Sequence, residues 1–202
     1  VGSSNTASGR FSGAFGFNNT ASGTGSAAFG LENTANGFSS SAFGQDNVAS
    51  GGFSVAFGKD NVASGGQNSS AFGVANTASA SASSAFGNGS RALNFGSTAI
   101  GFNAIADRDF AISVGQTGGE HQIIHMADGT EDFDAVNVRQ LRTLATWMGG
   151  GATFASGVFT APTFTIQGSN FNNVGAAFAA VDSRLTALAG SVGGPAGPQG
   201  PD

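Results

Sequence analysis

Few residues in this sequence could carry out acid–base or metal chemistry. His121 and His125 are the two histidines, and their four-residue separation is the spacing at which two side chains on one helix face can bind a metal. No cysteine could join them, and the serines fall in repeated turns and columns, away from any histidine. We therefore predict that the chain is not an enzyme and assign it no catalytic residue, no cofactor and no metal ligand.

Three further motifs are weak. Residues 23–28 match a loose G-x-G-x-x-A pattern, but a dinucleotide site requires a βαβ context that this region lacks. Asp46 and Asp60 occupy equivalent places in two repeats, whereas calcium-binding β-rolls need an Asp in every coil. Asn18 and Asn68 begin formal N-glycosylation sequons, to which we assign no function.

The composition excludes disorder and several classes of partner. Of the 202 residues, 34 are Gly and 19 are Phe, only 9% are charged and 40% are hydrophobic, which is the opposite of a disordered chain. Residues 1–100 hold three basic and three acidic groups, so the net charge of −5 lies in residues 101–202. Nucleic acids and anionic lipids require clustered cations, so we expect neither as a partner.

Membrane and export signals are lacking. No apolar run reaches the roughly 18 residues of a membrane span. The first residues have no signal-peptide pattern and already lie inside a repeat, so we interpret the chain as a fragment of a longer protein.

A 14-residue repeat organises the first part of the chain. An apolar residue followed by Gly recurs every 14 residues, with one step of 15 between Phe57 and Phe72. A ladder of alanines from Ala7 to Ala106 keeps the same spacing and the same insertion. The apolar residues of the first ladder, which we predict to be structural, are Phe15, Phe29, Phe43, Phe57, Phe72, Phe86, Ile100 and Val114.

Fourteen residues suit two strands and two tight turns, whereas a helical hairpin repeat needs about 33. We therefore predict one β-solenoid coil per repeat, with like residues stacked in columns. Stacking on neighbouring coils should bury each Phe, and the thin interior should leave some apolar columns for partner chains. The pattern leaves open which apolar column faces the roll interior and which faces the axis of a trimer. The extra residue should bulge in a turn near Gly65–Gln67, and each Gly after a Phe should serve a turn or a close backbone approach.

A neck, an insert and a second helix are predicted after the repeat. Asp134 is the predicted N-cap of a helix that ends near Met148. From 152 to 171 an alternating, Thr-rich pattern indicates short strands with a break at Pro162. A helix then begins near Asn173, and its apolar residues follow heptad steps that favour a coiled coil over packing on its own domain: Val174, Phe178, Val181, Leu185, Leu188 and Val192. Residues 194–202 form three Gly-Pro-X triplets, which indicate either a collagen-like trimer or a flexible linker.

These patterns resemble the trimeric autotransporter adhesins, the YadA-like proteins of Gram-negative bacteria. Residues 54–58 and 97–101 are similar to the head repeat, although the family favours Ile where this chain has Phe. The stretch 122–141 is similar to the neck, whose most specific motif here includes Asp134, Asn137 and Leu141. The stretch 149–188 resembles an interleaved β-insert that leads into a stalk; the tryptophan-ring type is one form of it, with Trp147 as the candidate ring residue.

The resemblance implies a mainly β fold: a left-handed parallel β-roll solenoid in a homotrimer, followed by a neck, a small β-insert and a trimeric coiled coil. The expected boundaries are 1–116 for the head, 117–148 for the neck and short helix, 149–172 for the insert, 173–193 for the start of the stalk and 194–202 for the collagen-like tail. It also implies display on the bacterial surface, with outer-membrane attachment through a C-terminal anchor absent from this chain.

The function implied is attachment to host cells or extracellular matrix, with autoaggregation as a further activity. The alternatives are a structural spacer within a fibre, a phage-fibre-like protein that binds or cleaves glycans, and an ice-binding solenoid. The column containing Thr34 is interrupted by Val48 and Val62, which disfavours ice binding, and the scarcity of acids disfavours glycan cleavage. Ligand-binding residues vary within the family, so no ligand site is predicted.

Overall fold

The computed structural model describes residues 2–192. The chain divides into two units, one that ends at Ile124 and one that begins at His125. The predicted tail at 194–202, together with Gly193 at the end of the predicted stalk segment, lies outside the described residues. Neither helix of residues 2–192 combines the length and the apolar character that crossing a bilayer requires.

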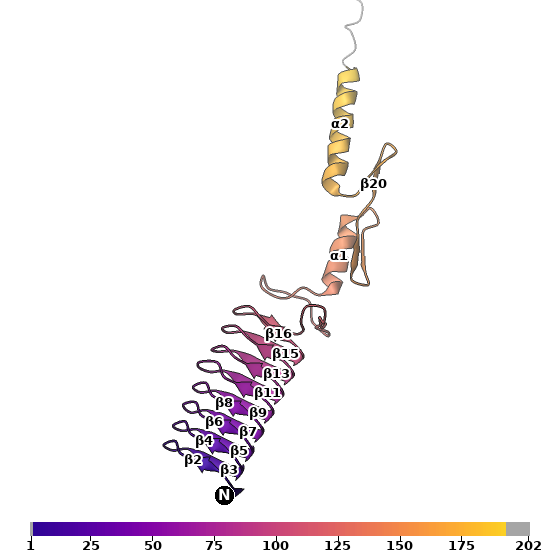
Figure 1. Ribbon diagram of the computed structural model, residues 1–202. Helices are drawn as coiled ribbons and strands as arrows, with labels where there is room; N and C mark the ends of the chain where they lie inside the picture. Colours follow the sequence, from indigo (N-terminus) through magenta and orange to yellow (C-terminus); the bar gives the residue numbers. More distant parts are fainter. Residues whose placement is uncertain (1, 193–202) are drawn as a thin grey trace, which may run out of the picture. The chain divides into compact units, whose positions relative to one another are not determined.

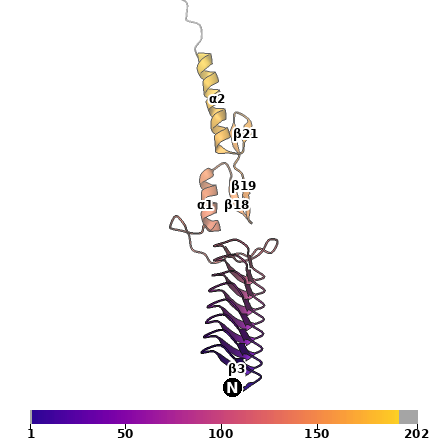
Figure 2. The ribbon, with the colours of Figure 1, turned by 60° about the vertical axis from the view of Figure 1, so that its left-hand side comes forward.

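The first unit is a β-solenoid in which each coil contributes one long and one short strand (Figures 1 and 2). The long strands form a nine-stranded parallel sheet and the short strands an eight-stranded one. The first sheet contains β1 (Gly2–Ser3), β3 (Gly13–Phe17), β5 (Ala27–Leu31), β7 (Ser41–Gln45), β9 (Val55–Lys59), β11 (Ser70–Val74), β13 (Ser84–Asn88), β15 (Thr98–Phe102) and β17 (Ile112–Ser113). The second contains β2 (Thr6–Ala7), β4 (Thr20–Ala21), β6 (Thr34–Ala35), β8 (Val48–Ala49), β10 (Val62–Ala63), β12 (Thr77–Ala78), β14 (Arg91–Ala92) and β16 (Ile105–Ala106).

The pairing register confirms the predicted repeat. Phe29 pairs with Phe43 and Ala35 with Ala49, so equivalent residues of successive coils lie side by side. The register step is 15 where Phe57 pairs with Phe72. The additional residue is taken up in the turn after Ala63, where Gly52 bridges to Gln67, as predicted.

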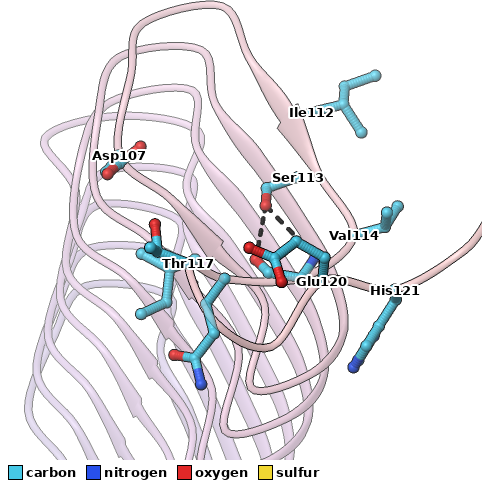
Figure 3. Close-up of a pocket in the computed structure, with 10 residues that line it drawn as sticks. Asp107, Ile112, Ser113, Val114, Thr117, Glu120 and His121 are labelled. Atoms are coloured by element: carbon cyan, nitrogen blue, oxygen red, sulfur yellow. Dashed lines mark hydrogen bonds between the residues drawn. The ribbon is translucent and has the colours of Figure 1, made fainter. Parts of the chain in front are cut away.

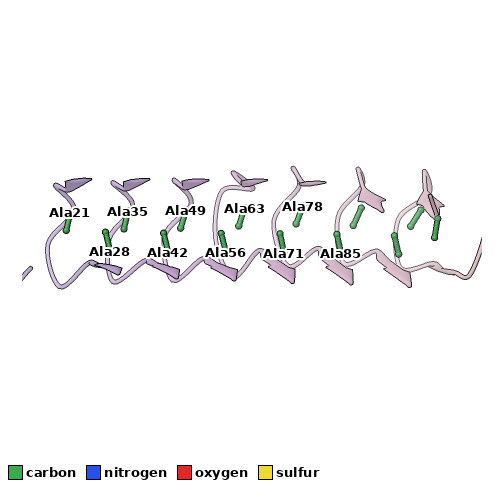
Figure 4. Packing of buried hydrophobic residues seen from close by; sticks show 14 of the residues in the cluster. Ala21, Ala28, Ala35, Ala42, Ala49, Ala56, Ala63, Ala71, Ala78 and Ala85 are labelled. Atoms are coloured by element: carbon green, nitrogen blue, oxygen red, sulfur yellow. The ribbon is translucent and has the colours of Figure 1, made fainter. Parts of the chain in front are cut away.

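Alanine fills the interior of the solenoid (Figure 4). Ala56 on a long strand and Ala63 on a short strand are both fully buried, and their equivalents in the other coils form one continuous cluster. Successive side chains of a strand point to opposite faces, so when Ala56 faces inward Phe57 must face outward. The structure therefore places the Ala columns inside the roll and the Phe column outside it, because the two sheets lie close enough for methyl groups but leave no room for aromatic rings. Stacking on neighbouring coils buries the Phe side chains only in part, since Phe57 is 54% exposed.

The glycine after each Phe lies inside the long strand and not in a turn, so of its two predicted roles the structure shows the close backbone approach. Gly58 has a φ of +119°, and a Cβ built on it would lie 2.0 Å from the carbonyl oxygen of Gly73 in the next coil. Both a positive φ and the close approach of a neighbouring backbone therefore require glycine at this point of the coil.

A column of buried asparagines links the coils along the stack. In each link the Nδ2 of one Asn donates to the Oδ1 of the Asn in the preceding coil, at 2.9 Å from Asn61 to Asn47 and from Asn76 to Asn61. Asn61 Nδ2 also lies within hydrogen-bond distance of the carbonyl oxygens of Phe57 and Gly73. The series ends at Ser90, whose hydroxyl donates to Asn76 Oδ1. These bonds satisfy buried polar groups that would otherwise be costly to desolvate.

The second unit contains two helices and two hairpins. Helix α1 spans Val138–Met148. Strands β18 (Thr153–Ala155) and β19 (Val158–Thr160) form one antiparallel hairpin, and β20 (Phe164–Ile166) and β21 (Ser169–Phe171) form the other. Pro162 lies between the hairpins, which confirms the predicted strands and their break.

Helix α2 spans Val174–Val192. Asn173 precedes it, and Asn173 Oδ1 accepts a hydrogen bond from the backbone N–H of Ala176 at 2.7 Å, which is an N-cap contact. The predicted start of this helix is therefore confirmed.

The predicted N-cap of α1 is wrong. Asn137 is the N-cap: its side chain accepts from the Gln140 N–H at 3.1 Å, and Gln140 Oε1 accepts from the Asn137 N–H at 3.2 Å. This reciprocal capping box starts the helix three residues later than an Asp134 cap would. Asp134 instead accepts hydrogen bonds from the backbone N–H groups of Thr130 and Glu131, which orders the turn before the helix.

Candidate functional site

An uncovered aromatic column runs along the long-strand sheet. Phe15 and Phe29 stack with ring centroids 5.0 Å apart, and similar contacts, at 5.1–6.3 Å, continue through Phe86. Phe57 is nevertheless 54% exposed in the single chain. The column continues as Ile100, which is also exposed, and Val114, which is half-buried. A contiguous apolar strip of this length is characteristic of an interaction surface.

The segment predicted to be the neck is organised by one carboxylate that sequence reasoning did not single out. Asp128 receives hydrogen bonds from Arg139 Nη2 at 2.6 Å, Arg139 Nε at 3.1 Å and Asn137 Nδ2 at 2.7 Å. The Arg139 hydrogen bond, followed by that from Asn137, holds the pKa of Asp128 below its usual value. Backbone N–H groups of Thr130 and Glu131 likewise lower the pKa of Asp134. Both carboxylates therefore hold the irregular segment that precedes α1 in place.

The C-terminal helix presents its heptad residues without a cover. Phe178, Leu185 and Leu188 are exposed along α2, and Leu141 on α1 is also partly exposed. Trp147 is 80% exposed and borders an apolar pocket of about 390 Å³. Its other lining residues are Met148, Phe164, Ile166, Val174, Ala177, Phe178 and Val181.

A second cavity, of about 490 Å³, lies at the end of the roll where coil stacking stops (Figure 3). Asp107, Glu120 and His121 are among its lining residues. Glu120 accepts a hydrogen bond from the Gly118 N–H at 2.9 Å, and backbone hydrogen bonds lower its pKa. Within residues 2–192 no three His, Cys, Asp or Glu side chains are grouped to hold a metal. His121 and His125 lie on irregular chain and not on a helix, so the helical spacing considered for them does not occur.

Family models match most of this architecture. A model described as the YadA head domain repeat matches residues 7–33, 35–61, 64–90 and 92–116, which together exceed half of the chain. A model described as the coiled stalk of trimeric autotransporter adhesin matches residues 122–163. The chain belongs to the trimeric autotransporter adhesins. The stalk match begins in the irregular segment before α1 and extends past α1 and the first hairpin.

Three curated relatives of this chain are named as autotransporter adhesins. The autotransporter adhesin EhaG of Escherichia coli O157:H7 is 38% identical over 84 residues, which are 38% of this chain and 5% of the relative. The trimeric autotransporter adhesin AtaA of Acinetobacter sp. strain Tol 5 is 37% identical over 93 residues, 39% of this chain and 3% of the relative. The autotransporter adhesin BadA of Bartonella henselae is 34% identical over 77 residues, 30% of this chain and 2% of the relative.

The chain thus spans one-twentieth or less of the length of these relatives. Among solved structures, it is similar to the crystal structure of the collagen-binding domain of the Yersinia adhesin YadA, at 28% identity with a TM-score of 0.38. That comparison covers 66% of this chain and 85% of the other.

Proposed function

We propose that this segment is a non-enzymatic part of a surface adhesin of a Gram-negative bacterium. In this proposal it assembles as a homotrimer and attaches the cell to host cells or extracellular matrix. The observation that carries the proposal is the aromatic column, because a soluble single chain has no reason to expose a continuous strip of phenylalanines. Family membership and the adhesin names of the relatives support the same reading.

The homotrimer explains several exposed surfaces at once. In one chain the aromatic column of the first unit is apolar and uncovered. The same holds, separately, for two surfaces of the second unit: the heptad stripe of α2 and the pocket beside Trp147. We propose that identical chains cover all three, with the column facing the trimer axis, α2 forming the coiled coil and Trp147 packing against partner side chains. The collagen-like sequence at 194–202 is consistent with a threefold assembly.

The substitution Phe57→Ala tests the assembly. If the column packs against partner chains, each chain should lose about 3–5 kcal/mol of stability, and the loss occurs three times in a trimer. Light scattering and thermal denaturation should show a weakened trimer. Phe11→Ala is the matched control, because Phe11 is an exposed phenylalanine outside the column. An unchanged melting temperature for Phe57→Ala would show that the column faces water.

Attachment is proposed to be distributed over the outer surface of the roll. The Asn ladder and the Ser column that includes Ser54 are buried, but a second polar position recurs on the outside, where Ser22, Asn36 and Ser64 are exposed. Repeated weak contacts at such positions gain strength through effective concentration. Deleting residues 28–41 or 28–55 removes one or two whole repeats and preserves the register. Binding to immobilised matrix proteins should fall progressively with the number of coils removed. Added salt should weaken it only modestly, because residues 1–100 have no net charge.

Two outcomes of this assay would contradict the proposal. A single surface substitution that eliminates attachment would point to one discrete site instead of distributed contacts. Attachment that survives removal of the coils would identify the roll as a structural spacer, a function favoured by its regular alanine interior and register. The neck, α1 and α2 are unchanged in the deletion variants and serve as the internal control for assembly.

A further inference from the structure

Two pairs of phenylalanines lie on one turn edge of the roll, away from the aromatic column. Phe38 and Phe53 occupy adjacent coils with ring centroids 5.2 Å apart and an interplanar angle of 77°. Phe95 and Phe110 repeat the arrangement further along the roll at 5.3 Å and 83°. Phe38 and Phe53 are 55% and 50% exposed. An edge-to-face pair of this kind leaves ring surface open to a ligand.

Folding alone does not account for Phe53. It has a φ of +56°, and every equivalent residue along this edge also has a positive φ. Glycine, Ser, Asn or Ala stands at that position in most coils: Gly25, Ser39, Asn68, Ala82 and Gly96. A bulky residue is disfavoured in this backbone conformation. Because half of the Phe53 surface is exposed, the free energy gained by burying it offsets only part of that cost. Phe11 and Phe110 stand at the equivalent position, and Phe53 and Phe110 each form an edge-to-face pair with another Phe. An unfavourable residue that recurs in this way is a reason to look for a function there.

The surroundings of the Phe38–Phe53 pair are uncharged. Backbone hydrogen bonds connect Thr24 to Ser39 and Gly52 to Gly66 across neighbouring coils, so these residues flank the two rings. On this edge, four successive coils have no charged residue in the turn that flanks or carries the rings: 22–26, 36–40, 50–54 and 64–69. Exposed Thr24, Gln67 and Asn68 offer hydroxyl and amide groups beside the rings. The Phe95–Phe110 pair differs, because Asp107, Arg108 and Asp109 lie in the turn that carries Phe110.

The size of the patch indicates what covers it. A phenylalanine presents about 150–250 Å², so two rings that are about half exposed offer roughly 200 Å². A stable protein interface buries roughly 800 Å² on each partner, and the residues around the rings are small and polar. A sugar ring matches the patch better, because its C–H face can lie on an aromatic ring while its hydroxyl groups reach the flanking polar side chains.

We propose that the Phe38–Phe53 pair is a binding platform for uncharged glycans. This inference rests on the proposed adhesive function and assigns part of it to a class of ligand. One platform per chain binds weakly, and three platforms in a trimer, multiplied over many fibres, give useful avidity. The flanking Thr24, Ser39, Gln67 and Asn68 supply the hydrogen-bonding groups expected around such a ligand.

The test is an array of neutral, sialylated and sulfated oligosaccharides probed with the labelled full chain. We expect binding to neutral members, and a loss of at least tenfold in Phe38→Ser/Phe53→Ser. Serine is compatible with the turn, since Ser39 already occupies the position equivalent to Phe53. Phe95→Ser/Phe110→Ser is the matched control, because it removes the same edge-to-face geometry and should leave binding to neutral glycans unchanged.

Several outcomes would overturn the proposal. The first two are the absence of binding to neutral glycans and binding confined to sialylated or sulfated glycans. The third is an equal loss of binding in the two double variants. The fourth is an oligomeric state that changes in Phe38→Ser/Phe53→Ser alone, which would make the pair a contact between chains. Attachment to matrix proteins is measured with the same samples. Attachment without glycan binding contradicts only the glycan platform, whereas loss of both contradicts the proposed adhesive function as well.

Discussion

Gly58→Ala should destabilise the roll by at least about 3 kcal/mol, or more than about 10 °C in the melting temperature of a unit of this size. The new methyl group would lie 2.0 Å from the carbonyl oxygen of Gly73, and the φ of +119° is unfavourable for alanine. Relief requires the neighbouring coil to move away, which would also break the backbone hydrogen bonds between the two strands. Circular dichroism during heating measures the effect.

Gly52→Ala is the control for this substitution. Gly52 belongs to the same coil, but its added Cβ would meet no atom closer than 3.7 Å, and its φ lies outside the positive range. The melting temperature of Gly52→Ala should remain within a few degrees of that of the unsubstituted chain. Similar melting temperatures for the two variants would mean that the coils separate easily and that the close packing of their backbones contributes little to stability.

Asn61→Asp should have an effect of similar size, about 3–5 kcal/mol at neutral pH. The oxygen that replaces Nδ2 would face Asn47 Oδ1 at 2.9 Å and the carbonyl oxygens of Phe57 and Gly73 at 3.0 and 2.7 Å. One carboxylate oxygen would keep the hydrogen bonds that Asn76 donates, whereas the other would face three acceptors with no hydrogen to donate, which is costly for a buried charge. Asn61→Ser should lose less, about 1–3 kcal/mol, because Ser90 already occupies the equivalent place in another coil.

The pH dependence of the unfolding free energy shows whether the charge of the new carboxylate causes the destabilisation in Asn61→Asp. Burial among acceptors favours the protonated acid, so the folded-state pKa of the carboxyl group introduced by Asn61→Asp should lie above the unfolded value of about 3.9. The destabilisation is then complete above the folded pKa and decreases as the pH falls toward the unfolded one. Denaturant unfolding of Asn61→Asp, measured relative to Asn61→Ser between neutral and mildly acidic pH, should show this recovery. A difference independent of pH would contradict the electrostatic explanation.

The repeat could be predicted in detail because the same residue types recur at a fixed spacing along the sequence. The Phe and Ala ladders established the coil length and the turn that holds the additional residue, and both are confirmed by the strand register. The orientation of the Phe column could not be settled in the same way. Alternation along a strand shows that Phe57 and Ala56 face opposite sides, but it does not reveal that the space between the sheets admits only methyl groups.

Other features were accessible in the sequence but were not recognised. Asn19, Asn33, Asn47 and Asn61 recur every 14 residues, so the buried ladder was visible as a third period. Asn137 and Gln140 also have capping-box spacing, which competes with Asp134 for the start of α1. The contact of Asp128 with Arg139 was harder to anticipate, because it joins residues from an irregular segment and a helix. The edge-to-face Phe pairs depend on diagonal neighbours in different coils, which a column-by-column comparison misses.

The asparagine ladder has a consequence for how such a protein changes length over generations. Each link points the same way, so a duplicated stretch of 14 codons inserts a coil that accepts from one neighbour and donates to the other. The inserted asparagine therefore leaves no buried polar group without a hydrogen bond, and the alanine side chains of the new coil pack as those of its neighbours do. Each duplication extends the head by roughly 4.8 Å, so the reach of the fibre can be adjusted in small genetic steps.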